Sequence, residues 1–366
     1  MLGFDLRDRT SVRRILRLVL LAVIVGLGVN TLLSLLMDRT QIIDSIRKVR
    51  IVYFVVPLLL FIASHLVDSL RLKLVLAQFR IRVSFLKAFY NSAVGTFFTN
   101  ITPMTAGGQP FQIYHLSVVG VPAETATNVI MSRFVEQAMT SMLISLFFLT
   151  QIAWIASSLR MGARLMYVAL GISLCVTVLL LILLIRPHFI GNLAIILERT
   201  FLGRLIGRIS GKHNWAPSLH RWSHRLRENV KMLWSTRTWA MVLDILMGVV
   251  NILLHAYSLM FVLQGVTGVS VPFLEVIITY VILWQVVFYI PTPGASGGVE
   301  GAFALVYSGL TGAVGSTVIA IFVWRLATYY LLLLFDGFVY AFLGRSGKGG
   351  RPRRAIREPA VGTLNR

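Results

Sequence analysis

The stretch Thr102-Pro103-Met104-Thr105-Ala106-Gly107-Gly108 decides the fold, because its pattern returns as Thr292-Pro293-Gly294-Ala295-Ser296-Gly297-Gly298. Both copies read Thr-Pro-x-x-x-Gly-Gly, and they lie 190 positions apart. A histidine comes 38 positions before each proline and an arginine about 30 positions after it: His65 and Arg133 in the first copy, His255 and Arg325 in the second. Proline and paired glycines interrupt helices, and an arginine inside an apolar run is costly in lipid. A chain that carries both features twice, in the same order, indicates a duplicated functional unit.

The composition is typical of a polytopic membrane protein. Of the 366 residues, 57% are apolar and 13% are charged, whereas soluble domains carry about a quarter charged residues. The net charge of +21 comes from basic residues between apolar runs, which is a positive-inside arrangement, so no nucleic-acid partner is expected. The single cysteine, Cys175, excludes an intramolecular disulfide, and the sequence predicts neither a metal nor a cofactor.

The apolar runs predict an all-α fold. Runs long enough to cross a bilayer as helices are 17–37, 51–71, 122–156, 164–186, 238–263 and 313–343. Two further stretches, 84–121 and 273–312, hold the repeated motif near their middle, and each half is too short for a comfortable crossing. We therefore predict about six full transmembrane helices plus two re-entrant helical hairpins.

Basic clusters set the predicted topology. They precede the first helix, follow 51–71 with Arg71 as their first member, fill the 186–237 connection and follow 313–343. The protein is then placed in the cytoplasmic (inner) membrane with both termini cytoplasmic. The loop 38–50 does not fit this topology, because it carries basic residues on the opposite side. With this topology the two repeats, about 51–156 and 238–343, are inverted, and their motif tips meet near the membrane midplane.

The chain is predicted to be one integral membrane domain, residues 1–344. The segment 190–236 has apolar residues at helical spacing with basic residues opposite, so it is expected either to lie on anionic inner-leaflet lipids or to pack under the bundle. The tail 345–366 is basic, rich in Gly and Pro, and expected to be disordered.

The motif tips are the first candidates for substrate binding. Their freed backbone groups need partners that lipid does not offer, and half-helix N-termini attract anions such as phosphate. The alternative is that they are ordinary connecting turns. Just past the glycines the copies differ at Gln109 and Glu300, which we expect to face a headgroup. The other candidates from the tips are Pro103, Gly107, Gly108, Pro293, Gly297 and Gly298.

Arg133 and Arg325 lie deep inside apolar runs, so each needs a partner. Glu136 follows Arg133 at i+3, while Asp336 lies three turns beyond Arg325 on the same face and Tyr329 lies at i+4. The arginines are predicted to bind a phosphate or another anionic headgroup. The alternative is a structural ion pair that locks helices together.

Two histidines are candidates for a proton relay. His65 stands beside Asp68 on one face of helix 51–71, and Asp244 and His255 belong to a polar stripe on helix 238–263. His65 with Asp68 is the better relay candidate, whereas His255 is favoured as a hydrogen-bonded packing residue.

No enzyme signature is present: the sequence has no GxxxxGK[ST] loop, HExxH or GxSxG. We therefore do not expect an enzyme. An intramembrane transferase is the alternative left open; its carboxylates would come from separate elements, namely Asp68, Glu136, Asp244 and Glu300.

At these residues the chain resembles the lysylphosphatidylglycerol synthase transmembrane-region family, over roughly residues 15–343. The matching residues are Asn100-x-x-Pro103-x-x-x-Gly107-Gly108, Leu116-x-x-x-Gly120 and Arg133 in the first half, and Pro293-Gly294-x-x-Gly297-Gly298-x-Glu300-Gly301 and Arg325-x-x-x-Tyr329 in the second. The resemblance implies a flippase-like domain and adds Asn100, Gly294 and Tyr329 to the substrate-binding candidates. Aminoacylation by this chain is not implied. The chain departs from the family at Gln109-Pro110, where many members carry a basic residue.

The sequence thus predicts a lipid flippase that moves a polar or anionic headgroup of a phospholipid or lipid-linked substrate by alternating access. An ion-coupled carrier of a small solute and a lipid-modifying transferase are the alternatives. A separate lipid synthase as a partner, and a homo-oligomer, are both compatible with this prediction.

Overall fold

The computed structural model describes residues 46–150, 162–186, 238–288 and 290–346, with isolated positions at 24, 28 and between 227 and 235. These residues form helices and turns, and none of them belongs to a strand. The elements are α3 (Val52–Gln78), α4 (Phe85–Ile101), α5 (Gly108–Val118), α6 (Ala123–Phe147), α8 (Gly162–Ile185), α12 (Thr238–Thr267), α13 (Phe273–Val287), α14 (Gly298–Thr311), α15 (Val314–Arg325), the π-helical turn η2 (Leu326–Leu331) and α16 (Leu332–Ser346).

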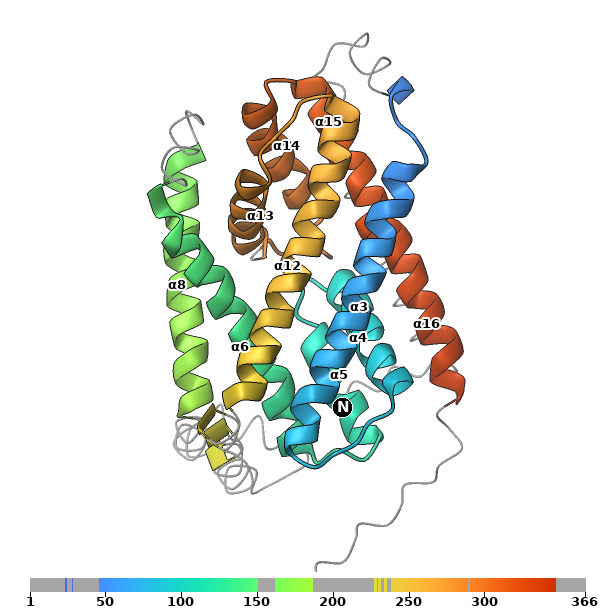
Figure 1. The fold of residues 1–366 in the computed structure, drawn as a ribbon, viewed down its shortest axis with the longest axis vertical. Coiled ribbons are helices and arrows are strands. Elements are labelled where there is room, and N and C mark those ends of the chain that lie inside the picture. The colour runs from blue at the N-terminus through green and yellow to red at the C-terminus, as the bar shows by residue number, and fades with distance from the viewer. Residues whose placement is uncertain are drawn as a thin grey trace, which may run out of the picture.

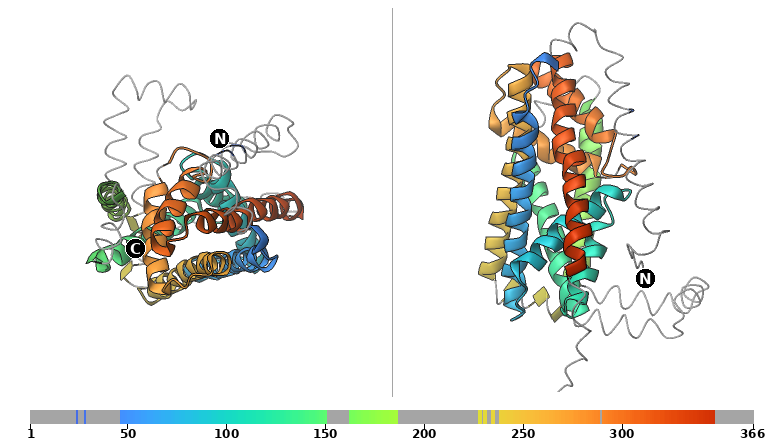
Figure 2. Two further views of the ribbon diagram at one scale, coloured as in Figure 1. Left: turned by 90° about the horizontal axis from the view of Figure 1, so that it is seen from above. Right: turned by 90° about the vertical axis from the view of Figure 1, so that its right-hand side faces the viewer.

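The two halves of the described chain share one order of elements: a long helix, a two-helix hairpin and a second long helical run. In Figure 1, α3 leads down to the hairpin α4–α5, whereas α12 leads up to the hairpin α13–α14. Both views in Figure 2 show α3 and α12 side by side, and these helices pack along each other. The halves therefore run in opposite directions, while the repeat boundaries and the re-entrant nature of the hairpins stay predictions.

The first hairpin turns at Thr102. Because a proline disfavours the helical conformation in the residue before it, Thr102 is extended (φ −106°, ψ 145°) and α4 ends at Ile101. The Thr102 hydroxyl then donates to the carbonyl of Phe98 (2.7 Å) and accepts the N–H of Gly107 (2.8 Å). The Thr-Pro pair thus both stops a helix and closes the turn that follows.

The second hairpin uses the same Thr-Pro break with a different turn. Thr292 donates to the carbonyl of Ser296 (2.8 Å), and Gly294 and Gly297 take left-handed backbone angles (φ 56° and 86°). In the first copy the corresponding Gly107 has φ −84°, so its paired glycines do not serve to supply a left-handed turn. Its neighbour Gly108 is needed for close packing instead, because a Cβ there would meet the Thr99 hydroxyl.

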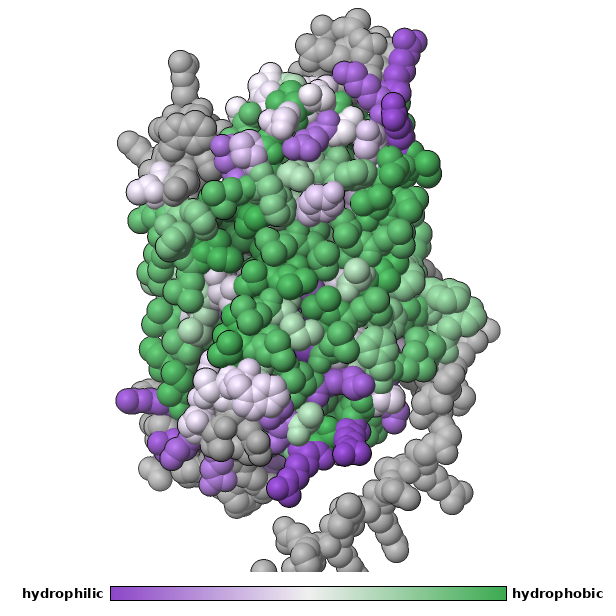
Figure 3. Space-filling model, in the orientation of Figure 1, coloured by the Kyte–Doolittle hydropathy of each residue, from purple (hydrophilic) through white to green (hydrophobic). Residues whose placement is uncertain are grey.

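Within the described ranges, three helical runs are long and apolar enough to cross a membrane: α3, α12 and the run Val314–Leu343 that joins α15, η2 and most of α16. Leu170–Leu183 and Phe273–Val287 are shorter apolar helices. Figure 3 shows apolar side chains in a band around the middle of one face, with polar side chains toward both ends. This supports a helical membrane fold; the predicted crossing at 17–37 lies almost wholly outside the described residues.

Two helices differ from the predicted ones, one in its end and one in its interior. Helix α3 continues to Gln78, so Arg71 lies inside the bundle at 3% exposure rather than in a cytoplasmic loop. The predicted helix 313–343 contains the π turn η2, which sequence periodicity did not indicate; such turns are rare and often lie at functional sites. The predictions for 190–236 and for 345–366 fall almost entirely outside the described residues.

The largest apolar core fills the space between α12, α13, α14 and α15. Its fully buried side chains include Phe303, Tyr307 and Trp324, and the Trp324 indole donates to the Ser258 hydroxyl (2.9 Å). This core holds the second hairpin against the long helices and so fixes one wall of the cavity described next.

Candidate substrate cavity

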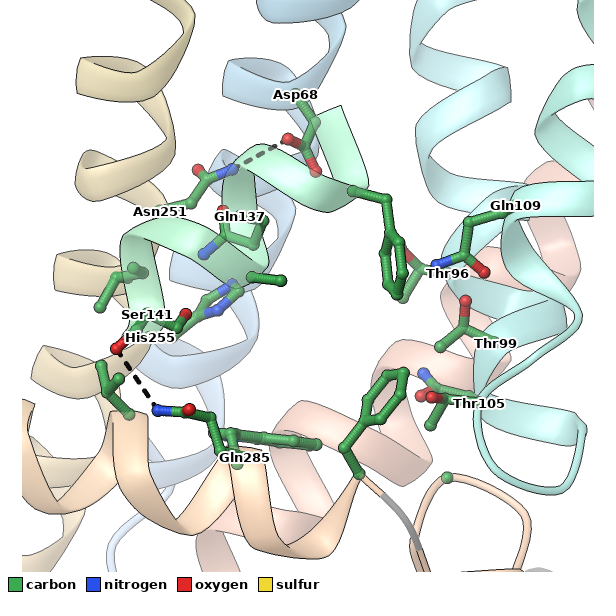
Figure 4. Close-up of a pocket in the computed structure, with 18 of the residues that line it drawn as sticks. Asp68, Thr96, Thr99, Thr105, Gln109, Gln137, Ser141, Asn251, His255 and Gln285 are labelled. Carbon is green, nitrogen blue, oxygen red and sulfur yellow. Dashed lines mark hydrogen bonds between the residues drawn. The ribbon is translucent and has the colours of Figure 1, made fainter. Parts of the chain in front are cut away.

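A cavity of about 500 Å³ lies between the two hairpins and the long helices. Its size is within the range of about 300–1,000 Å³ that holds small ligands. Figure 4 shows polar side chains pointing into it from opposite walls, with Gln109 and Thr96 on one side and Asn251 and Gln137 on the other. The amide side chains that line it are Asn100, Gln109, Gln112, Gln137, Asn251 and Gln285.

One end of the cavity is a network of two arginines and three carboxylates. Arg71 of α3 donates through Nε to Asp244 of α12 (2.9 Å) and through Nη2 to Glu136 of α6 (3.0 Å). Its Nη1 donates to Asp68 of the same helix (3.2 Å). Arg133 donates through Nη2 to Asp68 (2.9 Å), and its Nε lies 3.7 Å from Asp244. The network joins α3, α6 and α12.

Asp68 lines the cavity and has the most exposed side chain of this network. Its side chain is 32% exposed, whereas that of Arg133 is 11% exposed and that of Asp244 is fully buried. The same Asp68 oxygen that accepts from both arginines also accepts from the Asn251 amide (3.0 Å). A bound headgroup would therefore meet Asp68 and Asn251 before it reached the buried charges.

The partners that we predicted for the intramembrane arginines are corrected here. Glu136 pairs with Arg71, not with Arg133 at i−3, and Asp336 pairs with His65 (3.0 Å), not with Arg325. The physical reason is that helix packing brings a basic side chain of α3, Arg71 or His65, to 3.0 Å from each of these carboxylates. The predicted need for partners is met across helices.

A second buried ion pair stabilises the tip of the second hairpin. The Nε of Arg325 donates to Glu300 (3.0 Å), its Nη2 donates to the Gly294 carbonyl (3.2 Å), and its guanidinium lies 4.2 Å from the centre of the Tyr329 ring. The other Glu300 oxygen accepts the N–H of Gly297 (2.7 Å) at the start of α14.

Glu300 therefore does not face a headgroup as we expected, since it is fully buried and does not line the cavity. Its carboxylate takes the place at the α14 N-terminus where we expected an external anion. The geometry of Arg325 favours the structural ion pair over headgroup binding. Each arginine that lines the described cavity has a carboxylate partner, so none offers a free positive charge.

The histidines also differ from the prediction. His65 bonds Asp336 of α16 at 3% and 0% side-chain exposure, so it does not pair with Asp68 as a relay. His255 stacks on Phe61 with ring centres 4.0 Å apart and lines the cavity. Its Nε2 is buried and has no hydrogen-bond partner among the described residues, so the predicted hydrogen-bonded role is not seen at that atom.

The two motif tips touch. Pro103 and Pro293 form an isolated antiparallel bridge, and the Tyr329 hydroxyl lies within hydrogen-bond distance of the carbonyls of Asn100 (3.1 Å) and Pro293 (3.3 Å). Of the tip candidates, Asn100, Gln109 and Gly294 line the cavity. The others support the turns without lining it: Pro103, Gly107, Gly108, Pro293, Gly297 and Gly298.

Replacing Tyr329 with phenylalanine tests the tip contact. We expect a loss of about 1 kcal/mol in the free energy of unfolding, because one hydroxyl serves two buried carbonyls from different hairpins. Denaturant or thermal unfolding in detergent measures it. Tyr330→Phe is the matched control, since the neighbouring hydroxyl has no partner among the described residues. Equal effects of the two changes would show that the contact contributes nothing.

Sequence reasoning missed Arg71 as a site residue, because it was assigned to the basic cluster that follows the helix. The sequence does place His65, Asp68 and Arg71 on one helix face at i, i+3 and i+6, but this spacing does not by itself distinguish a site residue from the basic cluster. Gln285 was missed as well; it joins three helices by accepting from Ser173 (2.8 Å) and donating to Ser145 (2.6 Å). Nothing in the sequence distinguishes it from other amides.

A helical fold with apolar helices long enough to cross a membrane defines a helical membrane protein. Residues 19–335 match the family model of the lysylphosphatidylglycerol synthase TM region, and the chain belongs to that family, which confirms the resemblance found from its motifs. The chain is also similar to the "UPF0104 membrane protein" of Archaeoglobus fulgidus, at 24% identity over 326 residues that cover 86% of this chain and 94% of that protein. No solved structure matches the chain.

Proposed function

We propose that this protein transports lipid, moving a polar headgroup through the cavity while the acyl chains stay in the bilayer. The observation that carries the proposal is a cavity, lined by residues of both halves of the chain, in which amide and charged side chains stand among apolar ones. Polar and charged groups at membrane depth are costly and therefore mark substrate pathways. In transporters with repeated halves, the substrate site lies where the halves meet.

Hydrogen bonding, rather than net charge, would select the headgroup. The arginines lining the cavity are already paired with carboxylates, whereas the amides of Gln109, Gln112 and Gln137 each offer both donors and acceptors. A hydroxyl-bearing or amide-bearing headgroup matches this lining better than a bare anion does. The transport cycle needs no covalent step, and we propose no enzymatic activity.

Alternating access would require the two hairpin tips to separate. In the present state the bridge between Pro103 and Pro293 and the bonds of Tyr329 hold them together. Rocking of one half against the other would break these contacts, and it would also move α4 against α16 of the other half, on which α4 packs. We place the protein in the cytoplasmic membrane with both termini cytoplasmic, because basic residues flank the predicted crossings on one side.

The test is reconstitution in vesicles of phosphatidylethanolamine and phosphatidylglycerol. Fluorescent phosphatidylglycerol, phosphatidylethanolamine and diacylglycerol glycolipid serve as probes, and a membrane-impermeant quencher reports which leaflet holds each probe. We expect at least one probe to cross faster than in protein-free vesicles. Lack of movement of every probe, together with uptake of a soluble headgroup, would favour the small-solute carrier. A changed probe recovered by chromatography would favour the transferase.

Gln109→Leu is the variant that tests the cavity. Gln109 lines the cavity and is half-buried, so its amide is free to serve a headgroup. Losing a hydrogen bond of about 1.4 kcal/mol to the moving headgroup would slow transport roughly tenfold. Gln78→Leu, near the end of α3 and outside the cavity, is the control and should transport normally. Equal rates for the two variants would remove Gln109 from the pathway.

A further inference from the structure

The five-residue ionic network does not balance in charge. Arg71 and Arg133 supply two positive charges, and Asp68, Asp244 and Glu136 supply three negative charges when all are ionised. Glu136 is 2% exposed and Asp244 is fully buried. An unbalanced charge at such burial is strongly disfavoured, so the network must hold one further positive charge or lose a negative one.

Two contacts indicate which carboxyl groups would hold the additional positive charge. Glu136 Oε1 and Asp244 Oδ2 both accept from the same nitrogen, Nη2 of Arg71, at 3.0 and 3.4 Å. The two carboxyl groups therefore lie side by side at one guanidinium nitrogen. The second oxygen of Glu136 is buried and finds no donor among the described residues. Two adjacent carboxylates with an unpartnered oxygen are satisfied by one proton between them.

We propose that Glu136 and Asp244 share a proton, and that this proton is the coupling ion of the transport cycle. The proposal rests on the lipid transport proposed above. The pair consists of Glu136 on α6 and Asp244 on α12. The charged groups around it are Arg71 and Asp68 from α3 and Arg133 from α6. No other charged side chain in the described residues contacts the pair.

The network gives the proton a connection to the substrate. Asp68 faces the cavity and bonds both arginines, and Arg71 bonds both members of the carboxyl pair. When a headgroup donates a hydrogen bond to Asp68, the bond from Arg71 to Asp68 weakens. Arg71 then bonds more strongly to Asp244 and Glu136. Those carboxylates are then stabilised without the proton, and the O–H bond breaks with transfer of the proton to water in the open cavity. Proton release on one side of the membrane and uptake on the other would drive the cycle.

The proton itself is tested in purified protein, without transport. Infrared spectroscopy in heavy and light water detects the carbonyl band of a buried protonated carboxyl. We expect wild type to show such a band, and Glu136→Gln to lose it. Glu275→Gln, at the half-buried start of α13, removes a carboxyl outside the network and should retain the band. If Glu136→Gln and Asp244→Asn both keep the wild-type band, the shared proton does not exist.

The coupling is tested with the fluorescent probes in vesicles that carry a pH gradient. We expect the gradient to accelerate probe movement in wild type and in Glu275→Gln, and Glu136→Gln to lose that acceleration completely. Wild-type movement that ignores the pH gradient, or that follows a sodium gradient instead, would overturn the coupling. If wild type moves no probe under any gradient, the proposed transport fails, and the infrared result still decides whether the proton is there. If Glu136→Gln moves no probe, the decision passes to the infrared band and to Asp244→Asn.

Discussion

Glu300→Ala is expected to destabilise the protein by about 3–5 kcal/mol, because it leaves the Arg325 guanidinium buried without its carboxylate. Both groups are almost fully buried, at 0% and 3% side-chain exposure. The same substitution removes the acceptor for the N–H of Gly297 at the start of α14. Two buried donors would thus lose their partner through one change.

The measurement is the midpoint of thermal unfolding in detergent, followed by tryptophan fluorescence. Glu275→Ala is the matched control, because that carboxyl stands at the first turn of α13, half-buried and outside any ion pair among the described residues. Surface changes of this kind stay within about 0.5 kcal/mol. A shift for Glu300→Ala no larger than that of the control would contradict the assigned pair.

The double variant Glu300→Gln with Arg325→Met separates the pair from simple loss of volume. If the pair stabilises the hairpin tip as assigned, each single change is more damaging than the double change, since neither partner remains buried alone. Additive losses would mean that the two side chains act independently. The Tyr329 ring is present in the single and the double variants. Its contact with the guanidinium is lost equally in the two variants that carry Arg325→Met.

The sequence predicted the two helix breaks at the motifs because their signals are local. Pro103 and Pro293 break helices through steric effects on the residue before them, and that effect needs no tertiary context. The predicted stretches 84–121 and 273–312 accordingly contain α4–α5 and α13–α14 with their turns at the motifs. The helical class and the family likewise followed from composition and motif residues.

Pairing between helices could not be read in the same way. Arg71 reaches Asp244, a partner 173 positions away, and His65 reaches Asp336, which is 271 positions away. Periodicity indicates which face of a helix carries a charge, but not which neighbouring helix that face meets. The choice among several acids and bases within reach is made by packing, so predictions based on i+3 neighbours assigned the wrong partners.

A disulfide between residues 103 and 293 is expected to stop transport almost completely and reversibly. Pro103 and Pro293 pair in an isolated antiparallel bridge, and residues paired in this way have Cα atoms about 4.5–5.5 Å apart. Disulfides form at Cα separations of about 4.4–6.8 Å, so Pro103→Cys with Pro293→Cys suits the tips without backbone movement. The background is Cys175→Ser, which removes the only native thiol, itself exposed.

The cross-link is expected to stop transport because alternating access requires the tips to separate before the headgroup can leave on the other side. Probe movement should stop after oxidation, return after reduction, and be unaffected by oxidant in either single-cysteine variant. A variant that is fully cross-linked on a gel and still moves probe at the reduced rate would show that the tips never separate during the cycle. The headgroup would then have to pass beside the Pro103–Pro293 contact, along the wall that carries Gln109 and Gln112, and the bridge would be a fixed hinge between the two halves.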